Sequence, residues 1–196
     1  MKERQEVIFI HSPDGPSLDR LLREIGSVLA WYDLSFIKNG CDRWLVYLLA
    51  LIDPLIPSGL EEFCIRMEFS PRIASLLVED SEKAISVGKG FYRKPELQPS
   101  EIYHLLENLH TEWLLFIMAK TQQEETRRAI SRYFRDLKEV RPKLRGKDLK
   151  DMGIIPGPVY RHILNQLLDG QLNGDLSSRE EEMEFVRQHF IEGSQN

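Results

Sequence analysis

The stretch RGKDLKDMGIIPGPVYRHILNQLLDGQLNG, residues 145–174, contains two short helical segments joined by a turn rich in glycine and proline. Lys147–Met152 can form a helix, and Gly153 follows it, where a left-handed backbone would end the helix. Proline fits the first helical position because its missing N–H would have no partner there, so Pro158 is expected to open the second helix. The stretch therefore predicts a helix–hairpin–helix-like corner near residues 146–168.

The corner also has the chemistry of an anion-binding site. Ile154 and Ile155 are expected to anchor the turn in the core, and Gly157 would let the backbone approach a ligand closely. The second helix would expose the N–H groups of Val159 and Tyr160 at its positive end. Four cationic residues would surround that end: Lys143, Arg145, Lys147 and Arg161. These features predict a phosphate clamp; the alternative is a tight corner whose glycines and prolines serve only the turn.

Charge is distributed unevenly along this acidic chain. The net charge is −5 at pH 7, yet residues 120–161 contain 12 Lys and Arg against 6 Asp and Glu. Nucleic-acid affinity depends on the local field, so an acidic protein with one basic block is a candidate for such binding. Residues 122–140 predict an amphipathic helix whose outer side carries Arg128, Arg132 and Arg135. The alternative is that these cations only keep a helix face soluble.

Helical periodicity dominates the rest of the chain. Ser17 is a predicted N-cap, and residues 44–52 are apolar enough to form a helix buried in protein. Residues 111–120 are apolar on every face and are expected at the centre of the core. Only residues 6–10 resemble a strand. The prediction is an all-α fold with a multi-helix body and a tail.

The chain is expected to have three parts. Residues 92–100 contain two prolines and are the best candidate for a linker within the helical region. The N-terminal part of the body would then occupy residues 1–94, a central helical hairpin of the body residues 95–143, and the tail with the corner residues 144–196. A chain of 196 residues is long enough to bury a core.

The sequence shows none of the common catalytic or metal-binding motifs. It contains no glycine-rich phosphate loop, no Asp-x-Asp pair and no HExxH motif. Cys41 and Cys64 have no histidine spaced to complete a metal site and are expected to be reduced thiols. The acidic residues among positions 180–184, which follow Ser177 and Ser178, favour the start of a helix electrostatically. We expect no catalytic residue, metal ligand or cofactor in this chain.

No segment is suited to a membrane. The N-terminal stretch has four successive apolar residues, which is too few for the core of a signal peptide. The longest apolar run, residues 44–52, is shorter than the roughly 20 residues that a membrane span needs. Together with reduced cysteines, these features favour a cytoplasmic protein without a membrane partner.

Three short motifs stand out near the C-terminus. They are GKDL at Gly146–Leu149, GIIPGP at Gly153–Pro158, and the pattern L-x-G-x-x-x-x-R-x-x-E formed by Leu172, Gly174, Arg179 and Glu182. Together they resemble the C-terminal region of bacterial class II tRNA nucleotidyltransferases and poly(A) polymerases. The likeness is greatest to the long A-adding variety, in which DHH-phosphoesterase-like and CBS domains precede the nucleotidyltransferase head. The chain departs from the pattern at Arg145, where many relatives have Thr or Ser, and at Arg161, where many have Gly.

This resemblance implies a C-terminal body and tail that hold the acceptor–TΨC arm of tRNA while a head adds nucleotides to the 3′ end. The family's catalytic head, with its Gly-Ser and Asp-x-Asp motifs, has no match in this sequence. We therefore expect the chain itself to be non-catalytic, whereas the parent protein would be an enzyme that uses Mg and ATP. The expected partners are tRNA and the nucleotidyltransferase head.

Two other functions stay open on the sequence. One is an all-α scaffold or oligomerisation module without RNA contacts, and the other is a DNA-binding helix–hairpin–helix protein. The sequence does not distinguish a parent that adds A, CCA or poly(A), because those choices lie in the head. It also leaves open whether the chain forms a homo-oligomer.

Overall fold

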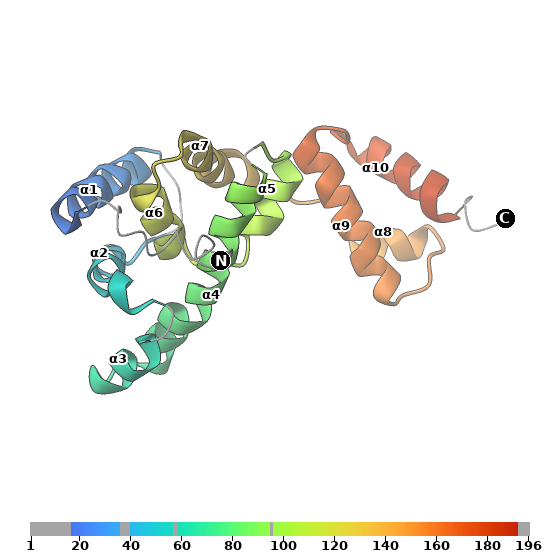
Figure 1. Ribbon diagram of the computed structural model, residues 1–196. Coiled ribbons are helices and arrows are strands. Elements are labelled where there is room, and N and C mark those ends of the chain that lie inside the picture. Colours follow the sequence, from blue (N-terminus) through green and yellow to red (C-terminus); the bar gives the residue numbers. More distant parts are fainter. Residues whose placement is uncertain (1–16, 36–39, 57–58, 95, 192–196) are drawn as a thin grey trace, which may run out of the picture. The chain divides into compact units, whose positions relative to one another are not determined.

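The computed structural model describes residues 17–35, 40–56, 59–94 and 96–191, which form helices joined by turns, with no strand among them (Figure 1). The all-α prediction is therefore confirmed. Residues 6–10, which resemble a strand, lie outside the described residues. The α-helices are α1 (Leu18–Leu34), α2 (Arg43–Ile52), α3 (Leu60–Arg66), α4 (Pro71–Arg93), α5 (Pro99–Leu106), α6 (Thr111–Lys120), α7 (Glu124–Arg132), α8 (Gly146–Asp151), α9 (Pro158–Asn173) and α10 (Arg179–Val186).

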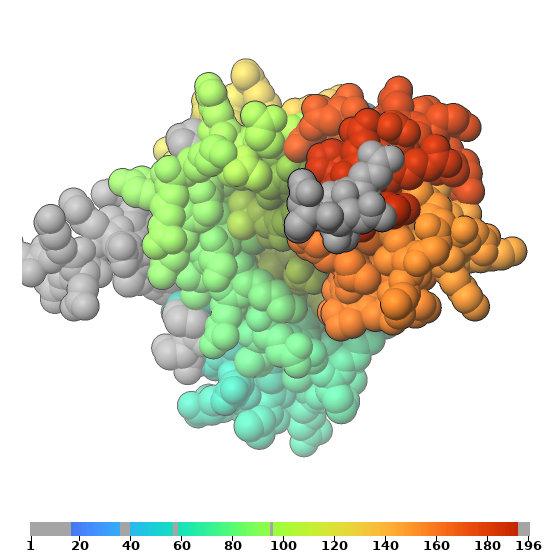
Figure 2. Space-filling model, turned by 90° about the vertical axis from the view of Figure 1, so that its right-hand side faces the viewer, coloured from blue at the N-terminus to red at the C-terminus, as the bar shows by residue number. Residues whose placement is uncertain are grey.

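These helices group into two compact units. Unit 1 contains residues up to Leu97 together with His104–Arg135, so it holds α1 to α4, α6 and α7. Unit 2 contains Gln98–Tyr103 together with residues from Asp136 onward, so it holds α8, α9 and α10. The two halves of α5 belong to different units. In the space-filling view, the orange to red atoms of α8 to α10 pack into one continuous body (Figure 2).

Helix α6 forms the centre of unit 1. Its residues Trp113–Ile117 and Ala119 are buried, and α1, α2, α4 and α7 contact it. The Trp113 side chain is completely buried, and its Nε1–H donates a hydrogen bond to the Leu76 carbonyl of α4 at 2.9 Å. A buried indole requires such a partner because an unpaired N–H would be destabilising. The predicted central position of this helix is confirmed.

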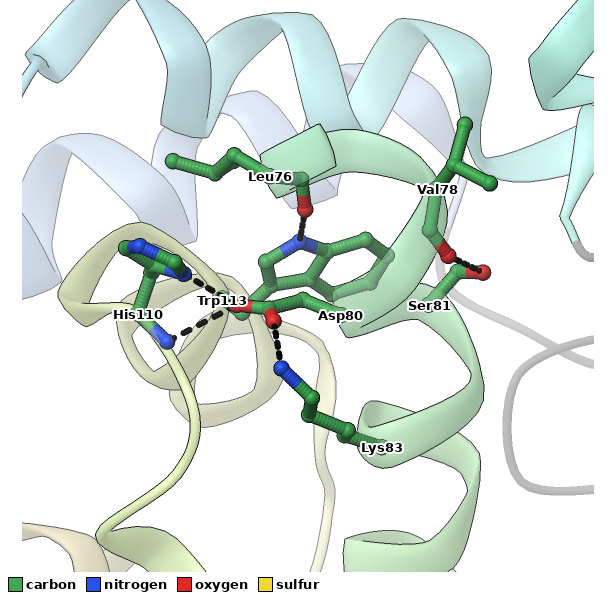
Figure 3. Close-up of polar contacts among 7 residues, drawn as sticks. All are labelled: Leu76, Val78, Asp80, Ser81, Lys83, His110 and Trp113. Atoms are coloured by element: carbon green, nitrogen blue, oxygen red, sulfur yellow. Dashed lines mark hydrogen bonds and ion pairs between the residues drawn. The ribbon is translucent and has the colours of Figure 1, made fainter. Parts of the chain in front are cut away.

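A buried carboxylate ties α4 to the start of α6 (Figure 3). Asp80 is 1% exposed, and its Oδ2 accepts a hydrogen bond from the backbone N–H of His110 at 2.9 Å. The same oxygen lies 2.6 Å from the His110 ring Nδ1, while Oδ1 lies 2.7 Å from the Lys83 ammonium. Because His110 is the N-cap of α6, Asp80 fixes where that helix begins.

Helix α2 differs from its prediction. The sequence predicts a helix buried in protein, and Leu45, Val46 and Leu49 do face the core against α1 and α6. On the opposite side, however, Trp44 is 47% exposed and Leu51 is 57% exposed. An apolar composition predicts that a helix is covered but does not identify what covers it. The prediction of a buried helix is therefore met on one face of α2, whereas the other face is exposed in this chain.

The basic helix, which carries Arg128, Arg132 and Arg135, also differs from its prediction. The sequence predicts one helix over residues 122–140, whereas α7 ends at Arg132 and a π turn, Tyr133–Leu137, follows it. The inner side is apolar as predicted, with Phe134 lying edge-on against Tyr32 of α1 at 5.3 Å between ring centroids. A π turn adds a residue to the turn, so the residues beyond it no longer follow α-helical spacing.

Candidate nucleic-acid interface

The predicted corner lies in unit 2 and consists of α8, α9 and the turn between them. Gly153 has φ +89°, a left-handed conformation, and its N–H donates to the Lys150 carbonyl at 2.9 Å. The N–H of Ile154 reaches back to the Leu149 carbonyl at 3.1 Å. These bonds satisfy carbonyls that the end of a helix would otherwise leave unpaired. The predicted stop at Gly153 is confirmed.

Tyr160 fixes the hairpin between the two helices. Its hydroxyl donates to the Ile154 carbonyl at 2.9 Å, and its ring lies beside Gly146, where an added Cβ would be 3.5 Å from Tyr160 Cδ2. The ring also packs against the buried core of the unit. This core consists of Leu144, Leu149, Ile163, Leu167 and Val186. The first turns of α8 and α9 are therefore held next to each other.

The start of α9 offers fewer hydrogen-bond donors than the sequence predicts. The Tyr160 N–H donates to the Gly157 carbonyl at 3.0 Å, because the first turn closes with a tight 3₁₀-type bond. The Val159 N–H has no acceptor among the described residues. The expectation that both amides are unpaired is therefore wrong for Tyr160, and a phosphate contact at Val159 stays a prediction.

Two further hairpin residues differ from their expected roles. Ile154 packs against the core of unit 2, whereas Ile155 is 82% exposed, so only the first isoleucine anchors the turn. Gly157 has φ 170°, which is an extended backbone that any residue adopts. A Cβ added there would have no described atom within 4 Å. The backbone of Gly157 is thus not unusual, but the open space next to it leaves room for a ligand.

Lys143 supports the corner rather than standing free beside it. Its ammonium donates to the Ser177 carbonyl, and its backbone N–H donates to Glu182 Oε1 at 3.0 Å. Glu182 also accepts hydrogen bonds from the Leu144 N–H at 2.7 Å and the Gln171 side chain at 2.6 Å. The Glu182 residue is 0% exposed. Its carboxylate therefore joins the chain before α8 to both α9 and α10.

A second carboxylate, that of Asp148, holds the start of α8. It accepts a hydrogen bond from the Arg145 N–H at 2.6 Å and another from Arg179 of α10 at 2.7 Å. The Arg145 side chain has no acceptor atom, so Asp148 alone supplies the side-chain part of this cap. The hydrogen bond from Arg179 is the main reason that the pKa of Asp148 lies below its usual value. Arg179 also donates to the Lys143 carbonyl at 3.4 Å.

The sequence assigns the acidic run 180–184 to the start of a helix, and this is confirmed for Glu181. Its carboxylate accepts from the N–H groups of Ser177 and Ser178, while its own N–H donates to Ser178 Oγ at 3.1 Å. The hydrogen bonds that its carboxylate accepts lower the pKa of Glu181, with the Ser177 N–H contributing most. The inward role of Glu182 was missed. Its position four residues before the apolar and buried Val186, on the same face of α10, is the signal that could have revealed it.

Some cationic side chains of unit 2 are exposed and form neither a hydrogen bond nor an ion pair with another described residue. Among them are Lys147, Lys150 and Arg161. The two lysines are three residues apart and share one side of α8. Arg161 directly follows Tyr160, whose ring lies beside the first residue of α8, so the corner brings these cations to neighbouring turns. Arg145 is also exposed. Lys150 was not among the cations that the sequence predicts at the corner.

The three arginines of the basic helix belong to unit 1. Arg128, Arg132 and Arg135 are exposed as predicted. Arg128 lies 3.2 Å from Glu124 and is therefore partly neutralised. Arg135 lies within the π turn, so its direction does not follow the α-helical spacing assumed for it. Contact of this group with RNA stays a prediction.

Neither a metal site nor a membrane helix is found in the described part of the chain. No group of three or more His, Cys, Asp or Glu side chains in those residues is placed to hold a metal ion. None of the helices described is both long enough and apolar enough to cross a membrane.

Sequence similarity to a protein of known function is extensive. The chain is 36% identical, over 185 residues, to the A-adding tRNA nucleotidyltransferase of Geobacter sulfurreducens, and the match covers 91% of this chain. The chain is homologous to A-adding tRNA nucleotidyltransferases. It spans 21% of the length of that relative. No family model matches the chain.

Two solved structures of CCA-adding enzymes have the same fold as this chain. A CCA-adding enzyme in complex with CTP gives a TM-score of 0.65 at 19% identity, covering 94% of this chain and 43% of that chain. A CCA-adding enzyme of Thermotoga maritima complexed with tRNA gives 0.66 at 18% identity, covering 93% of this chain and 43% of that chain. At these identities the likeness shows the fold alone.

The motifs that resemble tRNA nucleotidyltransferases now have defined places in the fold. Gly153 ends α8, Asp148 and Arg179 pair across the corner, and Glu182 anchors the preceding chain. Among the motif residues, Lys147 is exposed and unpaired, and Gly157 has open space beside it. Most of the motif therefore builds the corner, while a smaller part of it is available for a ligand.

Proposed function

We propose that this chain is the C-terminal body and tail of an A-adding tRNA nucleotidyltransferase and that it binds tRNA without adding nucleotides itself. The homology to the G. sulfurreducens enzyme over 91% of the chain carries the proposal. Because the chain spans 21% of that enzyme, nucleotide transfer with Mg and ATP is assigned to a head outside this sequence. The shared fold with a CCA-adding enzyme complexed with tRNA supports tRNA as the ligand.

The exposed cations of the corner are the proposed tRNA contacts. Phosphates bind most readily to cationic side chains whose charge is not neutralised and whose N–H groups are not already hydrogen-bonded within the protein. Lys147, Lys150 and Arg161 meet this condition, whereas the Lys143 ammonium is bound to the Ser177 carbonyl. The open space beside Gly157 would allow an RNA backbone to approach the start of α9.

Binding of tRNA to this chain is expected to weaken strongly as salt increases. If about four phosphates are neutralised, the log–log slope of affinity against salt should be roughly −3 to −4. Fluorescence anisotropy of labelled tRNA, titrated between about 50 and 200 mM salt, measures this slope.

The same protein, given tRNA without its 3′ terminus together with ATP, CTP and Mg²⁺, should extend no RNA.

Three results would contradict this reading. Absence of tRNA binding at low salt would favour an all-α scaffold without RNA contacts. Equal competition by duplex DNA would favour a DNA-binding helix–hairpin–helix protein. Robust extension of tRNA by a contaminant-free preparation would show that the chain is catalytic.

Substitutions at the corner should separate RNA binding from stability. Lys147→Ala and Arg161→Ala are each expected to weaken tRNA binding by about 1 kcal/mol, as for other charge-assisted hydrogen bonds. Gly157→Val should weaken binding more, because its side chain would fill the open space. None of the three should lower the melting temperature, since the cations are exposed and the Gly157 backbone is extended.

An exposed lysine of α4 provides the matched control. Lys89→Ala removes the same charge from unit 1 and should bind tRNA like the unchanged protein. If Lys147→Ala and Arg161→Ala bind as tightly as this control at low salt, the corner is not an RNA contact. A lower melting temperature for Gly157→Val would instead show that this glycine serves the turn.

A further inference from the structure

One face of α2 is apolar and exposed. Trp44, Leu48 and Leu51 are spaced by four and three residues, so they lie within about 60° of one another around the helix. Trp44 is 47% exposed, Leu51 is 57% exposed and Leu48 is half-buried. Leu55, in the short 3₁₀ helix that follows α2, is 37% exposed. An unbroken line of large apolar side chains therefore faces away from the core of unit 1.

The apolar face extends beyond α2. The Trp44 ring lies 6.4 Å from that of Phe69, which precedes α4, and Phe69 lies 5.9 Å from Phe63 of α3. Here the name "α2 surface" denotes Trp44, Leu48, Leu51, Leu55 and Phe69. Exposed apolar side chains scattered singly are common, but a contiguous set of this kind marks an interaction site.

The composition of α2 is typical of a helix that is covered on this side as well. After Arg43 the helix reads WLVYLLALI and contains no charged residue on any face. A helix on the surface of a soluble protein normally carries polar residues on its outer side. Interfaces between protein segments that stay together permanently are as apolar as a protein core. Interfaces that form transiently are more polar.

The α2 surface is not suited to RNA. Protein–nucleic acid interfaces are strongly basic. The one cation within α2, Arg43, is paired with Asp33 at 2.5 Å. The occupant must therefore offer an apolar protein surface.

We propose that the α2 surface docks against the nucleotidyltransferase portion of the parent protein. This rests on the proposed function, in which the chain is part of a longer enzyme. The chain matches 21% of the G. sulfurreducens enzyme, so roughly four fifths of that enzyme is other polypeptide. The chain also covers only 43% of the solved CCA-adding enzymes. A portion of the same protein is present at equal stoichiometry and can keep an apolar face covered at all times.

The test uses two chains in solution: this one and the polypeptide encoded upstream in the same reading frame, produced separately. Titration calorimetry should detect binding between them, and Leu51→Glu should weaken it at least about tenfold, because a charge would be buried at the centre of the contact. Tyr92→Glu is the matched control, since Tyr92 is an exposed apolar residue at 74% in the last turn of α4. That variant should bind as the unchanged chain does.

Measurements on the chain alone complete the test. Leu51→Glu should keep the melting temperature and the tRNA affinity of the unchanged chain, since a core or RNA-binding role would alter one of them. If the upstream portion binds the variant and the unchanged chain equally, the docking proposal is wrong while the proposed function stands. A dimer of the chain that Leu51→Glu dissociates would also overturn it, in favour of a second copy. If no upstream reading frame encodes a nucleotidyltransferase portion, the proposed function itself fails.

Discussion

Glu182→Ala is expected to lower the free energy of unfolding of unit 2 by about 3 kcal/mol or more. The substitution would leave the N–H groups of Lys143 and Leu144 without their acceptor. Leu144 is 1% exposed, so water cannot easily replace the carboxylate there. Each buried donor left unpaired costs about 1–3 kcal/mol. A loss of this size is a large fraction of the stability of a small domain.

Urea unfolding followed by circular dichroism measures this effect. Glu180→Ala is the matched control, because Glu180 is exposed in the same turn of α10, and it should change the stability by no more than about 0.5 kcal/mol. Glu182→Gln should fall between the two, since an amide offers one acceptor oxygen in place of two. A change below about 1 kcal/mol for Glu182→Ala would mean that the carboxylate does not anchor the corner.

Trp113→Ala is expected to destabilise unit 1 by about 3–5 kcal/mol, as for other buried aromatic residues truncated to alanine. The side chain is completely buried in the middle of α6 and packs against Phe116 with their ring centroids 5.9 Å apart. Its loss would create a cavity and also remove the hydrogen bond that the indole donates to the Leu76 carbonyl. Protein interiors are densely packed, so the neighbours can fill such a cavity only in part.

The chain offers a tryptophan control for this experiment. Trp44→Ala removes a side chain that is 47% exposed and should cost less than about 1 kcal/mol in the same unfolding assay. Trp113→Phe should lie between the two, because it keeps a ring in the core but loses the hydrogen bond to Leu76. Equal losses for Trp44→Ala and Trp113→Ala would contradict the assignment of α6 as the centre of unit 1.

Much of the fold follows from local features of the sequence. Helical periodicity predicts an all-α chain, Ser17 caps α1 by accepting a hydrogen bond from the Arg20 N–H at 3.4 Å, and Gly153 ends α8. These features depend on a few neighbouring residues and on backbone conformation. Sequence alone is informative for them because no distant partner is needed.

The errors arise where a distant partner decides the outcome. Glu182 belongs to an acidic run suited to a helix start, and only the fold brings the N–H groups of Lys143 and Leu144 to it. The exposed side of α2 depends in the same way on what surrounds the helix. The Tyr160 amide and the π turn after Arg132 are small changes of helix geometry that apolar spacing does not record.

Glu182, Asp148 and Tyr160 hold the corner in shape through contacts within the protein, so an RNA bound there as proposed would meet a preformed surface. Its long cationic side chains would still lose freedom on binding, at about 0.5–1.5 kcal/mol each, but the backbone would not need to be ordered. Association can then proceed as the docking of a preorganised template, accelerated by long-range electrostatic steering. Salt would accordingly change how fast and how tightly tRNA binds while leaving the template itself unaltered.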